Sequence, residues 1–288
     1  MAVTFKNLFI SMRPKQWTKN LFLFAALFFI KAFADFGKVF LAVEAFVLFC
    51  LASSAIYLFN DIVDLPKDRE HPLKKLRPLA AGKISVLVAA AESVLLGVAS
   101  ILGGFYLSFW FGLLVTSYIL LNVAYSLCLK NVIILDVFII AIGFVIRVVA
   151  GAVAINVPFS SWLILCTFFL TLFLAISKRK SEVLLNLSSG NRPVLGGYSL
   201  AFLDQMSMVA LSVTIISYTF YTFSSEHSKF LMLTVPIVLY GLLKYFYIVN
   251  ERREVDDGPS DVFLRESGLQ LTVLVWIIVS VLILIYGK

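Results

Sequence analysis

The chain has 288 residues, of which 61% are hydrophobic and 14% are charged, and its formal net charge is +7. A soluble globular domain contains roughly 45–50% apolar and about 25% charged residues, so this composition excludes an ordinary soluble domain. The apolar residues fall in runs of about 18–24, the length that an α-helix needs to cross a bilayer. We therefore expect an all-α, polytopic membrane protein.

Nine transmembrane helices are predicted in chain order. They lie near residues 20–36, 38–59, 84–105, 107–128, 133–155, 160–177, 205–224, 229–249 and 267–286. The first differs from the others in carrying Lys31 and Asp35 near its end. No linker or soluble segment interrupts the pattern, so residues 1–288 are expected to form a single integral membrane domain.

The basic residues are distributed unevenly between the two sets of loops that these spans define. Most of the 24 Lys and Arg residues lie at the N-terminus and in residues 60–83, 129–132, 178–204 and 250–266. Basic loops face the cytoplasm, so the pattern predicts a multi-pass protein of the cell inner (plasma) membrane with a cytoplasmic N-terminus. Because these loops account for the positive charge, no nucleic-acid partner is expected.

An acidic stretch follows the second predicted span. If the helix continues through it, Asn60, Asp61, Asp64 and Asp68 fall within about 100° of arc and share one face. Pro66 strains the last turn, so Asp68 is the member least firmly placed on that face. Clustered oxygen ligands without His or Cys are typical of a site for a hard cation.

Mg²⁺ fits this stretch, because it takes one or two carboxylates and completes its shell with water and substrate phosphates. Lys74 and Arg77 follow closely and are suited to binding phosphate oxygens. The stretch therefore predicts a site for a magnesium-bound phosphorylated substrate at the membrane surface. The alternative is a solvated loop whose charges end the helix and anchor it to lipid headgroups.

The same stretch, "NDIVDLPKD" from Asn60, resembles the NDxxDxxxD signature of the UbiA-type membrane prenyltransferase superfamily. The continuation "REHPLKKLRPLAAGKIS" and the segment "NVAYSLCLKNVIILDVFIIAIGFVIRVVAGA" are also similar to that superfamily. The resemblance covers nearly the whole chain. It implies a UbiA-type bundle of transmembrane helices with cytoplasmic cap loops, and Mg²⁺ as the cofactor.

Three further stretches resemble the decaprenyl-phosphate phosphoribosyltransferase branch of this superfamily. They are "RPKQWTKN" at 13–20, "KRKSE" at 178–182 and "LRESGLQLTVLVW" at 264–276. This resemblance implies transfer of 5-phosphoribose from phosphoribosyl diphosphate to a polyprenyl phosphate, with release of diphosphate, for cell-wall arabinan synthesis. The loop after the sixth span supports this branch, because it opens with Lys178, Arg179 and Lys180 and lacks a second acid-rich motif.

The resemblance assigns the acidic residues to metal binding and catalysis. Asn60, Asp64 and Asp68 are the expected metal ligands, and Asp61 is a further ligand, a supporting partner or a contact to ribose hydroxyls. The acceptor phosphate is already ionised, so no general base is needed, and catalysis would rest on positioning and on neutralising the departing diphosphate.

The remaining candidate residues are basic or aromatic and are expected to bind substrate. The set comprises Lys19, Tyr57, Lys74, Arg77, Lys130, Arg147, Lys178 and Arg179. Membrane anchoring is the alternative for Lys19, Tyr57 and Lys130. Arg147 lies inside a span, where a cation is costly and indicates a function, and we expect it to contact the lipid phosphate or the donor. Its alternative is a structural ion pair with Glu44 or Glu92.

Two rival functions remain open on the sequence. One is a UbiA-type prenyltransferase that uses an isoprenyl diphosphate donor. The other is a non-catalytic membrane transporter or scaffold, for which Asp64→Ala would leave function intact. The sequence does not determine the oligomeric state, and a homo-oligomer is compatible with it.

Overall fold

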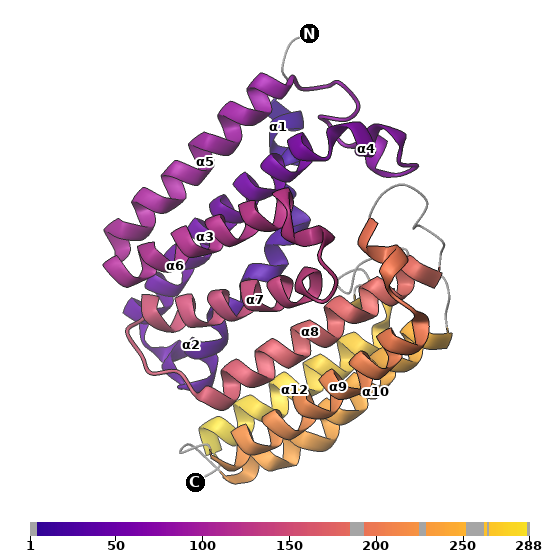
Figure 1. The fold of residues 1–288 in the computed structure, drawn as a ribbon. Helices are drawn as coiled ribbons and strands as arrows, with labels where there is room; N and C mark the ends of the chain where they lie inside the picture. Colours follow the sequence, from indigo (N-terminus) through magenta and orange to yellow (C-terminus); the bar gives the residue numbers. More distant parts are fainter. Residues whose placement is uncertain (1–4, 185–192, 225–228, 252–261, 264, 287–288) are drawn as a thin grey trace. The chain divides into compact units, whose positions relative to one another are not determined.

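The computed structural model describes residues 5–184, 193–224, 229–251, 262–263 and 265–286. Over these residues the chain is helical and contains no β-strand, which confirms the predicted all-α architecture. The contacts divide the chain into two compact units, Met1–Pro158 and Phe159–Lys288, which we describe one at a time (Figure 1). The single domain expected from the sequence stays a prediction.

The first unit contains the N-terminal helices and three long helices after the acidic stretch. Its elements are α1 (Phe5–Ser11), η1 (Pro14–Phe24), α2 (Ala25–Phe29), η2 (Ala32–Ala34), α3 (Phe36–Val63), α4 (Leu65–Glu70), η3 (Lys74–Leu76), α5 (Val86–Leu107), α6 (Phe109–Leu127), η4 (Leu129–Asn131) and α7 (Leu135–Ala154). Three of the four long helices begin at polar N-caps, which satisfy backbone N–H groups that lack a partner within the helix. Asp35, Ser85 and Ser108 cap α3, α5 and α6 in this way.

The first predicted span, residues 20–36, is not one continuous helix. The segment consists of the 3₁₀ helix η1, the short α2 and the 3₁₀ turn η2. Between α2 and η2, Lys31 has a positive φ of 59°, which a regular helix does not allow. Because a 3₁₀ helix rises about 2.0 Å per residue, η1 and α2 together still extend about 30 Å, the thickness of the bilayer core.

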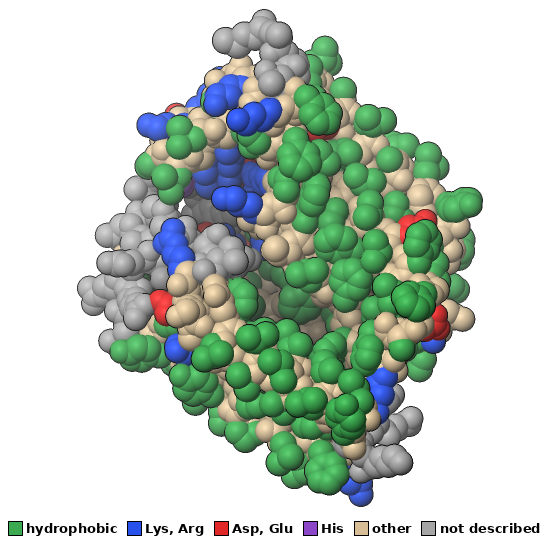
Figure 2. Space-filling model, turned by 180° about the vertical axis from the view of Figure 1, so that it is seen from behind, with side chains coloured by type: hydrophobic (Ala, Val, Ile, Leu, Met, Phe, Trp, Pro, Cys, Tyr) green, Lys and Arg blue, Asp and Glu red, His purple; other side chains and the backbone are tan. Residues whose placement is uncertain are grey.

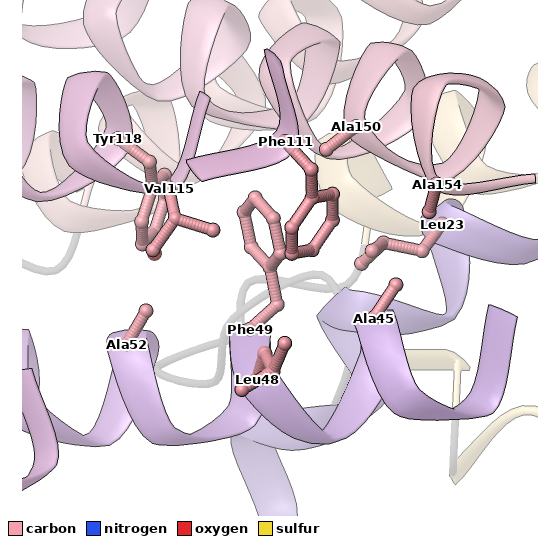
Figure 3. Packing of buried hydrophobic residues seen from close by; sticks show 10 residues of the cluster. All are labelled: Leu23, Ala45, Leu48, Phe49, Ala52, Phe111, Val115, Tyr118, Ala150 and Ala154. Carbon is pink, nitrogen blue, oxygen red and sulfur yellow. The ribbon is translucent and has the colours of Figure 1, made fainter. Parts of the chain in front are cut away.

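The core of the first unit is built from η1, α3, α6 and α7. Its buried members are Leu23, Ala45, Leu48, Phe49, Ala52, Phe111, Val115, Tyr118, Ala150 and Ala154. Figure 3 shows Phe49 of α3 facing Phe111 and Tyr118 of α6, with ring centroids 5.8 Å and 5.4 Å apart. In a bilayer such close packing, rather than exclusion of water, holds helices together.

The second unit consists of four long helices and their short connections. Its elements are α8 (Ser161–Leu184), η5 (Pro193–Gly197), α9 (Leu200–Phe223), η6 (Lys229–Thr234), α10 (Val235–Glu251) and α12 (Ser267–Tyr286). α8 packs against α9, and α10 packs against α12. Tyr218 of α9 joins two other elements through its hydroxyl, which lies 2.6 Å from Oγ1 of Thr234 and accepts from Nε1 of Trp276 at 2.7 Å.

Eight helices of the described residues are long and apolar enough to cross a membrane. They match the second to ninth predicted spans to within a few residues at most of their ends, so the predicted polytopic architecture is confirmed and the number nine is approximate. Hydrophobic side chains cover much of the face seen in Figure 2. On α5, for example, Leu87 and Leu95 are 80% and 69% exposed, as expected for a helix that faces lipid.

Candidate active site

The acidic stretch lies where α3 ends and α4 begins. α3 ends at Val63, so the expected continuous helix through Asp68 is wrong. Pro66 explains the break, because it lacks an N–H and its ring clashes with the carbonyl four residues earlier; it is tolerated in the first turn of α4. The backbone nevertheless keeps the spacing of a turn: the N–H groups of Asp64 and Asp68 donate to the carbonyls four residues earlier, both at 2.9 Å.

Arg77 brings two of the aspartates together. Its Nη1 lies 3.0 Å from Oδ1 of Asp61 and also donates to Oδ2 of Asp68. Both carboxylates are buried, with 4% and 3% of their surfaces exposed, whereas 27% of the Arg77 side chain is exposed. His71 shapes the loop before Arg77, because its Nδ1 accepts from the backbone N–H of Leu73 and Lys74. The bonds from Arg77 to Asp61 and Asp68 are charge-assisted hydrogen bonds, which are among the strongest in proteins.

Arg13 is a site residue that the sequence did not single out. It lies between α1 and η1, and its Nη2 donates to Oδ1 of Asp61, 48 positions further along the chain. Its guanidinium also lies 5.1 Å from the centre of the Tyr57 ring. Burial lowers the pKa of Arg13 from its ordinary value, and the Asp61 carboxylate raises it; arginine remains protonated in proteins. The only available signal was its position at the head of the "RPKQWTKN" stretch.

Lys130 binds the third aspartate. Its Nζ lies 2.6 Å from Oδ1 of Asp64, and the two side chains are 11% and 24% exposed. Lys130 belongs to η4, and the turn that follows contains Ile134 at φ 71° and ψ −45°. A β-branched residue with positive φ is strained, and such strain is concentrated at functional sites. The turn between α6 and α7 therefore carries Lys130 to Asp64 at some conformational cost.

Four other predicted site residues, on η1, α3 and η3, are partly buried. Asn60 is partly exposed on the last turn of α3. Tyr57, one turn earlier, is partly buried against Arg13. Lys19 and Lys74 are partly buried on η1 and η3. The structure thus joins Tyr57 to the site directly, through Arg13.

The charges of this site balance. We call the three aspartates the acidic cluster: Asp61, Asp64 and Asp68. We call the three cations that contact it its counter-ions: Arg13, Arg77 and Lys130. Among the described residues, no three His, Cys, Asp or Glu side chains lie close enough to form a metal site as they stand. The ligand atoms still fit a hard cation, since they are all oxygens and Mg²⁺ needs only one or two protein carboxylates.

Arg147 lies elsewhere, in the interior of α7, with 5% of its surface exposed. Its Nε donates to Oδ1 of Asn20 at 2.8 Å, its Nη1 to the carbonyl of Gly143 at 2.9 Å, and its Nη2 to the hydroxyl of Tyr118 at 2.7 Å. Its Cζ lies 4.7 Å and 4.9 Å from the ring centres of Tyr118 and Phe144. All of these partners are neutral.

The structural alternative for Arg147, an ion pair with Glu44 or Glu92, is not formed within the described residues. Its expected contact with a substrate phosphate stays a prediction. Asp136, which shares its helix, is fully buried near the start of α7.

The basic segment of the second unit is helical rather than a loop. α8 was expected to end at residue 177, but it continues to Leu184, so Lys178, Arg179 and Lys180 lie on its last turns. The apolar run ends at residue 177, whereas hydrogen bonding continues because nothing in the following residues breaks a helix. Residues 185–192, including Arg192, lie outside the described part of the chain.

The acids near this helix end are paired with cations. Arg179 is 2% exposed and contacts Glu182 one turn further on. Lys180 contacts Asp204 of α9 and Asn250 of α10. Lys178 is partly buried. The segment thus presents a basic helix end whose two nearby carboxylates are already held by cations.

Comparison with known proteins shows the family of the chain. Residues 20–265 match the UbiA prenyltransferase family. The decaprenyl-phosphate phosphoribosyltransferase of Mycolicibacterium smegmatis is 32% identical over 282 residues, which cover 93% of this chain and 89% of the relative. The protein of the same name from Corynebacterium glutamicum is 34% identical, over 93% of this chain and 83% of the relative.

Solved structures share the fold. A UbiA homolog from Archaeoglobus fulgidus bound to GPP and Mg²⁺ superposes with a TM-score of 0.75 at 19% identity, covering 96% of this chain and 99% of that chain. The same homolog bound to DMAPP and Mg²⁺ gives a TM-score of 0.74, also at 19% identity, over 96% of this chain and 98% of that chain. With the family match over residues 20–265, the chain therefore belongs to the UbiA prenyltransferase family.

Proposed function

We propose that this protein transfers 5-phosphoribose from phosphoribosyl diphosphate to a polyprenyl phosphate of the decaprenyl type. The reaction releases diphosphate at the cytoplasmic face of the plasma membrane, and its product serves cell-wall arabinan synthesis. The named relatives support this activity, since they match 93% of the chain. The observation that carries the proposal is the acidic cluster with its counter-ions, which supplies both metal ligands and phosphate-binding cations at the end of a span.

The metal would be held by oxygen atoms of the acidic cluster. Asn60, Asp64 and Asp68 are the proposed ligands, and Asp61 supports them. When bound there, Mg²⁺ would neutralise negative charge on the departing diphosphate. The protein's own contribution is to keep these oxygens together at the junction of α3 and α4, where Pro66 separates the two helices.

The counter-ions have a second use once a metal and a diphosphate are present. Arg77 and Lys130 now contact Asp68 and Asp64, which are proposed metal ligands, and Arg13 contacts the supporting Asp61, so metal binding would release positive charge next to the substrate phosphates. Arg77 and Arg13 can bind phosphate oxygens bidentately, and Lys130 can bind them as a point charge. Lys19, Lys74 and the Tyr57 hydroxyl complete the proposed donor site.

The chemistry requires no proton transfer by the protein. An oxygen of the acceptor phosphate forms a bond to C1 of the ribose, and the bond from C1 to the diphosphate oxygen breaks with its electron pair. Both the nucleophile and the leaving group are already anionic, so the residues act by orientation and by electrostatic stabilisation.

The basic end of α8 supports a donor that carries a further phosphate, as phosphoribosyl diphosphate does, over an isoprenyl diphosphate. The carboxylates paired at this end, Glu182 and Asp204 of α9, lie on different helices and belong to no acid-rich motif like that at the junction of α3 and α4, so they form a poor second metal site. Lys178 and Arg179 are instead suited to binding a substrate phosphate.

Transfer can be measured directly on purified protein in lipid vesicles. We expect label from radioactive phosphoribosyl diphosphate to enter the organic phase when polyprenyl phosphate and Mg²⁺ are present, and to stay in water when EDTA is added. A parallel reaction contains a labelled isoprenyl diphosphate and no phosphoribosyl donor. Label transferred only in that second reaction would overturn the proposal in favour of an ordinary prenyltransferase.

A further inference from the structure

Arg147 is a buried cation whose charge has no acidic partner in the part of the chain that the structure describes. Three of its N–H groups bind neutral oxygens and two aromatic rings lie against its guanidinium. An arginine inside a span is costly, so either it binds an anion from outside the protein or its contacts serve another purpose. Its depth in the membrane decides between these roles.

The rise of the backbone along three helices separates Arg147 from the level of the acidic cluster. The 3₁₀ helix η1 joins Arg13, which contacts Asp61, to Asn20, which contacts Arg147; seven residues of 3₁₀ helix extend about 14 Å. On α3, Ser53 contacts Asn20 and lies eight residues before Asp61, or about 12 Å. From the start of α7 to Arg147 the rise is about 18 Å.

With the acidic cluster at the membrane surface, as proposed above, these distances put Arg147 near the middle of the bilayer core, which is about 30 Å thick. A phosphate held at the acidic cluster, or at the headgroup level of the membrane, lies well above that depth. The contacts of Arg147 therefore indicate a different purpose, and one of them joins it to Asn20 of η1.

Asn20 ties η1 to the rest of the first unit. It is fully buried; its Oδ1 accepts from Arg147, and its Nδ2 lies 3.3 Å from Sγ of Cys50 and 3.2 Å from Oγ of Ser53 on α3. Four elements thus meet at the Asn20–Arg147 pair: η1, α3, α6 and α7. Tyr118 supplies the contact from α6.

The backbone of η1 needs such support. A 3₁₀ helix of eleven residues is long for its kind, because its hydrogen bonds are poorly aligned. One turn after Arg147, a Cβ added at Gly151 would lie only 1.9 Å from the carbonyl oxygen of Leu23, so η1 packs directly on the backbone of α7. Just before the start of η1, the carbonyl of Met12, next to Arg13, accepts a hydrogen bond from the hydroxyl of Ser54 on α3.

We propose that Arg147 is a positioning residue for the donor site. Through Asn20 it fixes η1 against α3, α6 and α7, and η1 in turn holds Arg13 in contact with Asp61. The guanidinium is needed because only its planar fork can bind Asn20, Tyr118 and the Gly143 carbonyl at once. The kinetic part of this inference rests on the proposed phosphoribosyl transfer; the placement of η1 does not.

The placement of η1 can be measured through Cys50, without any substrate. Cys50 is 3% exposed and its thiol lies against Asn20. In a Cys128→Ser/Cys166→Ser background it is the only thiol of the three cysteines in the chain. We expect Arg147→Gln, Arg147→Lys and Asn20→Leu each to raise the rate of Cys50 labelling by N-ethylmaleimide severalfold. Thr116→Val is the matched control, because it removes one hydrogen bond within α6 and none between elements.

Kinetics separate positioning from direct binding of a substrate. We expect Arg147→Lys and Arg147→Gln each to raise KM for phosphoribosyl diphosphate about tenfold, because misplacing a binding group is costly. KM for polyprenyl phosphate should be unchanged in both variants. Asn20→Leu should have the same effect, and the double variant should be no worse than either single one. If the Arg147 variants fail to fold, Tyr118→Phe removes one hydrogen bond, keeps the ring, and should raise KM for the donor to a smaller extent.

Two results would overturn this inference. The first is full rescue by Arg147→Lys in both measurements, because charge alone would then suffice. The second is a higher KM for polyprenyl phosphate with Cys50 still protected, which would mean that Arg147 contacts the acceptor. If the wild-type protein transfers no phosphoribose, the proposed function fails, and the labelling of Cys50 alone decides the role of Arg147.

Discussion

The junction of α3 and α4 in the first unit and the end of α8 in the second both combine acids with cations, but they do so differently. The acidic cluster receives its counter-ions from three separate segments, which contain Arg13, Arg77 and Lys130. At the end of α8, Arg179 pairs with Glu182 only one turn away, and Lys180 binds Asp204. The first arrangement depends on the tertiary fold, whereas the second is partly local to one helix.

This difference indicates different uses for the two clusters. In the first unit Arg77 is partly exposed over the buried Asp61 and Asp68, and Asp64 is itself 24% exposed beside Lys130, so an incoming ion can reach these groups. In the second unit the cation Arg179 is buried and Asp204 is 45% exposed. The first cluster is therefore suited to binding a metal with its phosphates, and the second to binding phosphate alone.

The largest expected effect comes from Asp64→Asn. Loss of one carboxylate ligand should reduce phosphoribosyl transfer at least about 100-fold, since electrostatic stabilisation of the leaving group is lost. Asp35→Asn is the matched control on the same helix, because Asn caps a helix N-terminus as well as Asp does. Transfer of label in vesicles measures both. Equal turnover of the Asp64 variant and the wild type would refute the metal assignment.

Arg179→Gln should have the next largest effect, and mainly on stability. It removes the ion pair between the buried Arg179 and the largely buried Glu182, which should cost about 3 kcal/mol and lower the thermal midpoint. Adding Glu182→Gln should restore the midpoint. If Arg179 also binds phosphate, the double variant will be stable but will still have a raised KM for one substrate; normal KM values for both would leave Arg179 a structural residue only.

Lys130→Met should change metal binding in two opposite directions. Without the cation at Asp64, free Mn²⁺ should bind about tenfold more tightly, because a nearby positive charge of this kind is worth roughly 1–2 kcal/mol. Mn²⁺ with phosphoribosyl diphosphate should bind more weakly, because a phosphate contact is lost. Titration calorimetry can follow both, with the exposed Lys67→Met of α4 as control. Weaker binding in both titrations would mean that Lys130 only supports the fold.

Asp204→Asn should have the smallest effect. Its carboxylate is 45% exposed, and exposed ion pairs contribute less than about 1 kcal/mol. Neither the thermal midpoint nor the affinity for Mn²⁺ should change measurably. A clear loss of metal affinity in this variant would place a second metal site at the end of α8 and would remove the contrast between the two units.

Much of the fold and part of the site could be predicted because they depend on neighbouring residues. Apolar runs give the spans, and the spacing of the aspartates predicts that their carboxylates lie close together, as Arg77 shows by contacting both Asp61 and Asp68, although α3 ends at Val63. The predicted helix boundaries were wrong where hydrophobic runs alone do not determine the backbone structure. Residues 20–36 form 3₁₀ and short α-helical pieces held by contacts with α3 and α7, and α8 continues beyond its apolar run.

The sequence by itself determined that the chain is a helical membrane protein with an oxygen-rich site at the end of one span, because hydrophobicity and helical periodicity act over a few turns. Only the tertiary structure decided which cations meet which acids. Arg13 and Asp61 are 48 positions apart, Lys130 and Asp64 are 66 apart, and Asn20 and Arg147 are 127 apart. Such pairs form when helices pack, and packing depends on how all their side chains fit together.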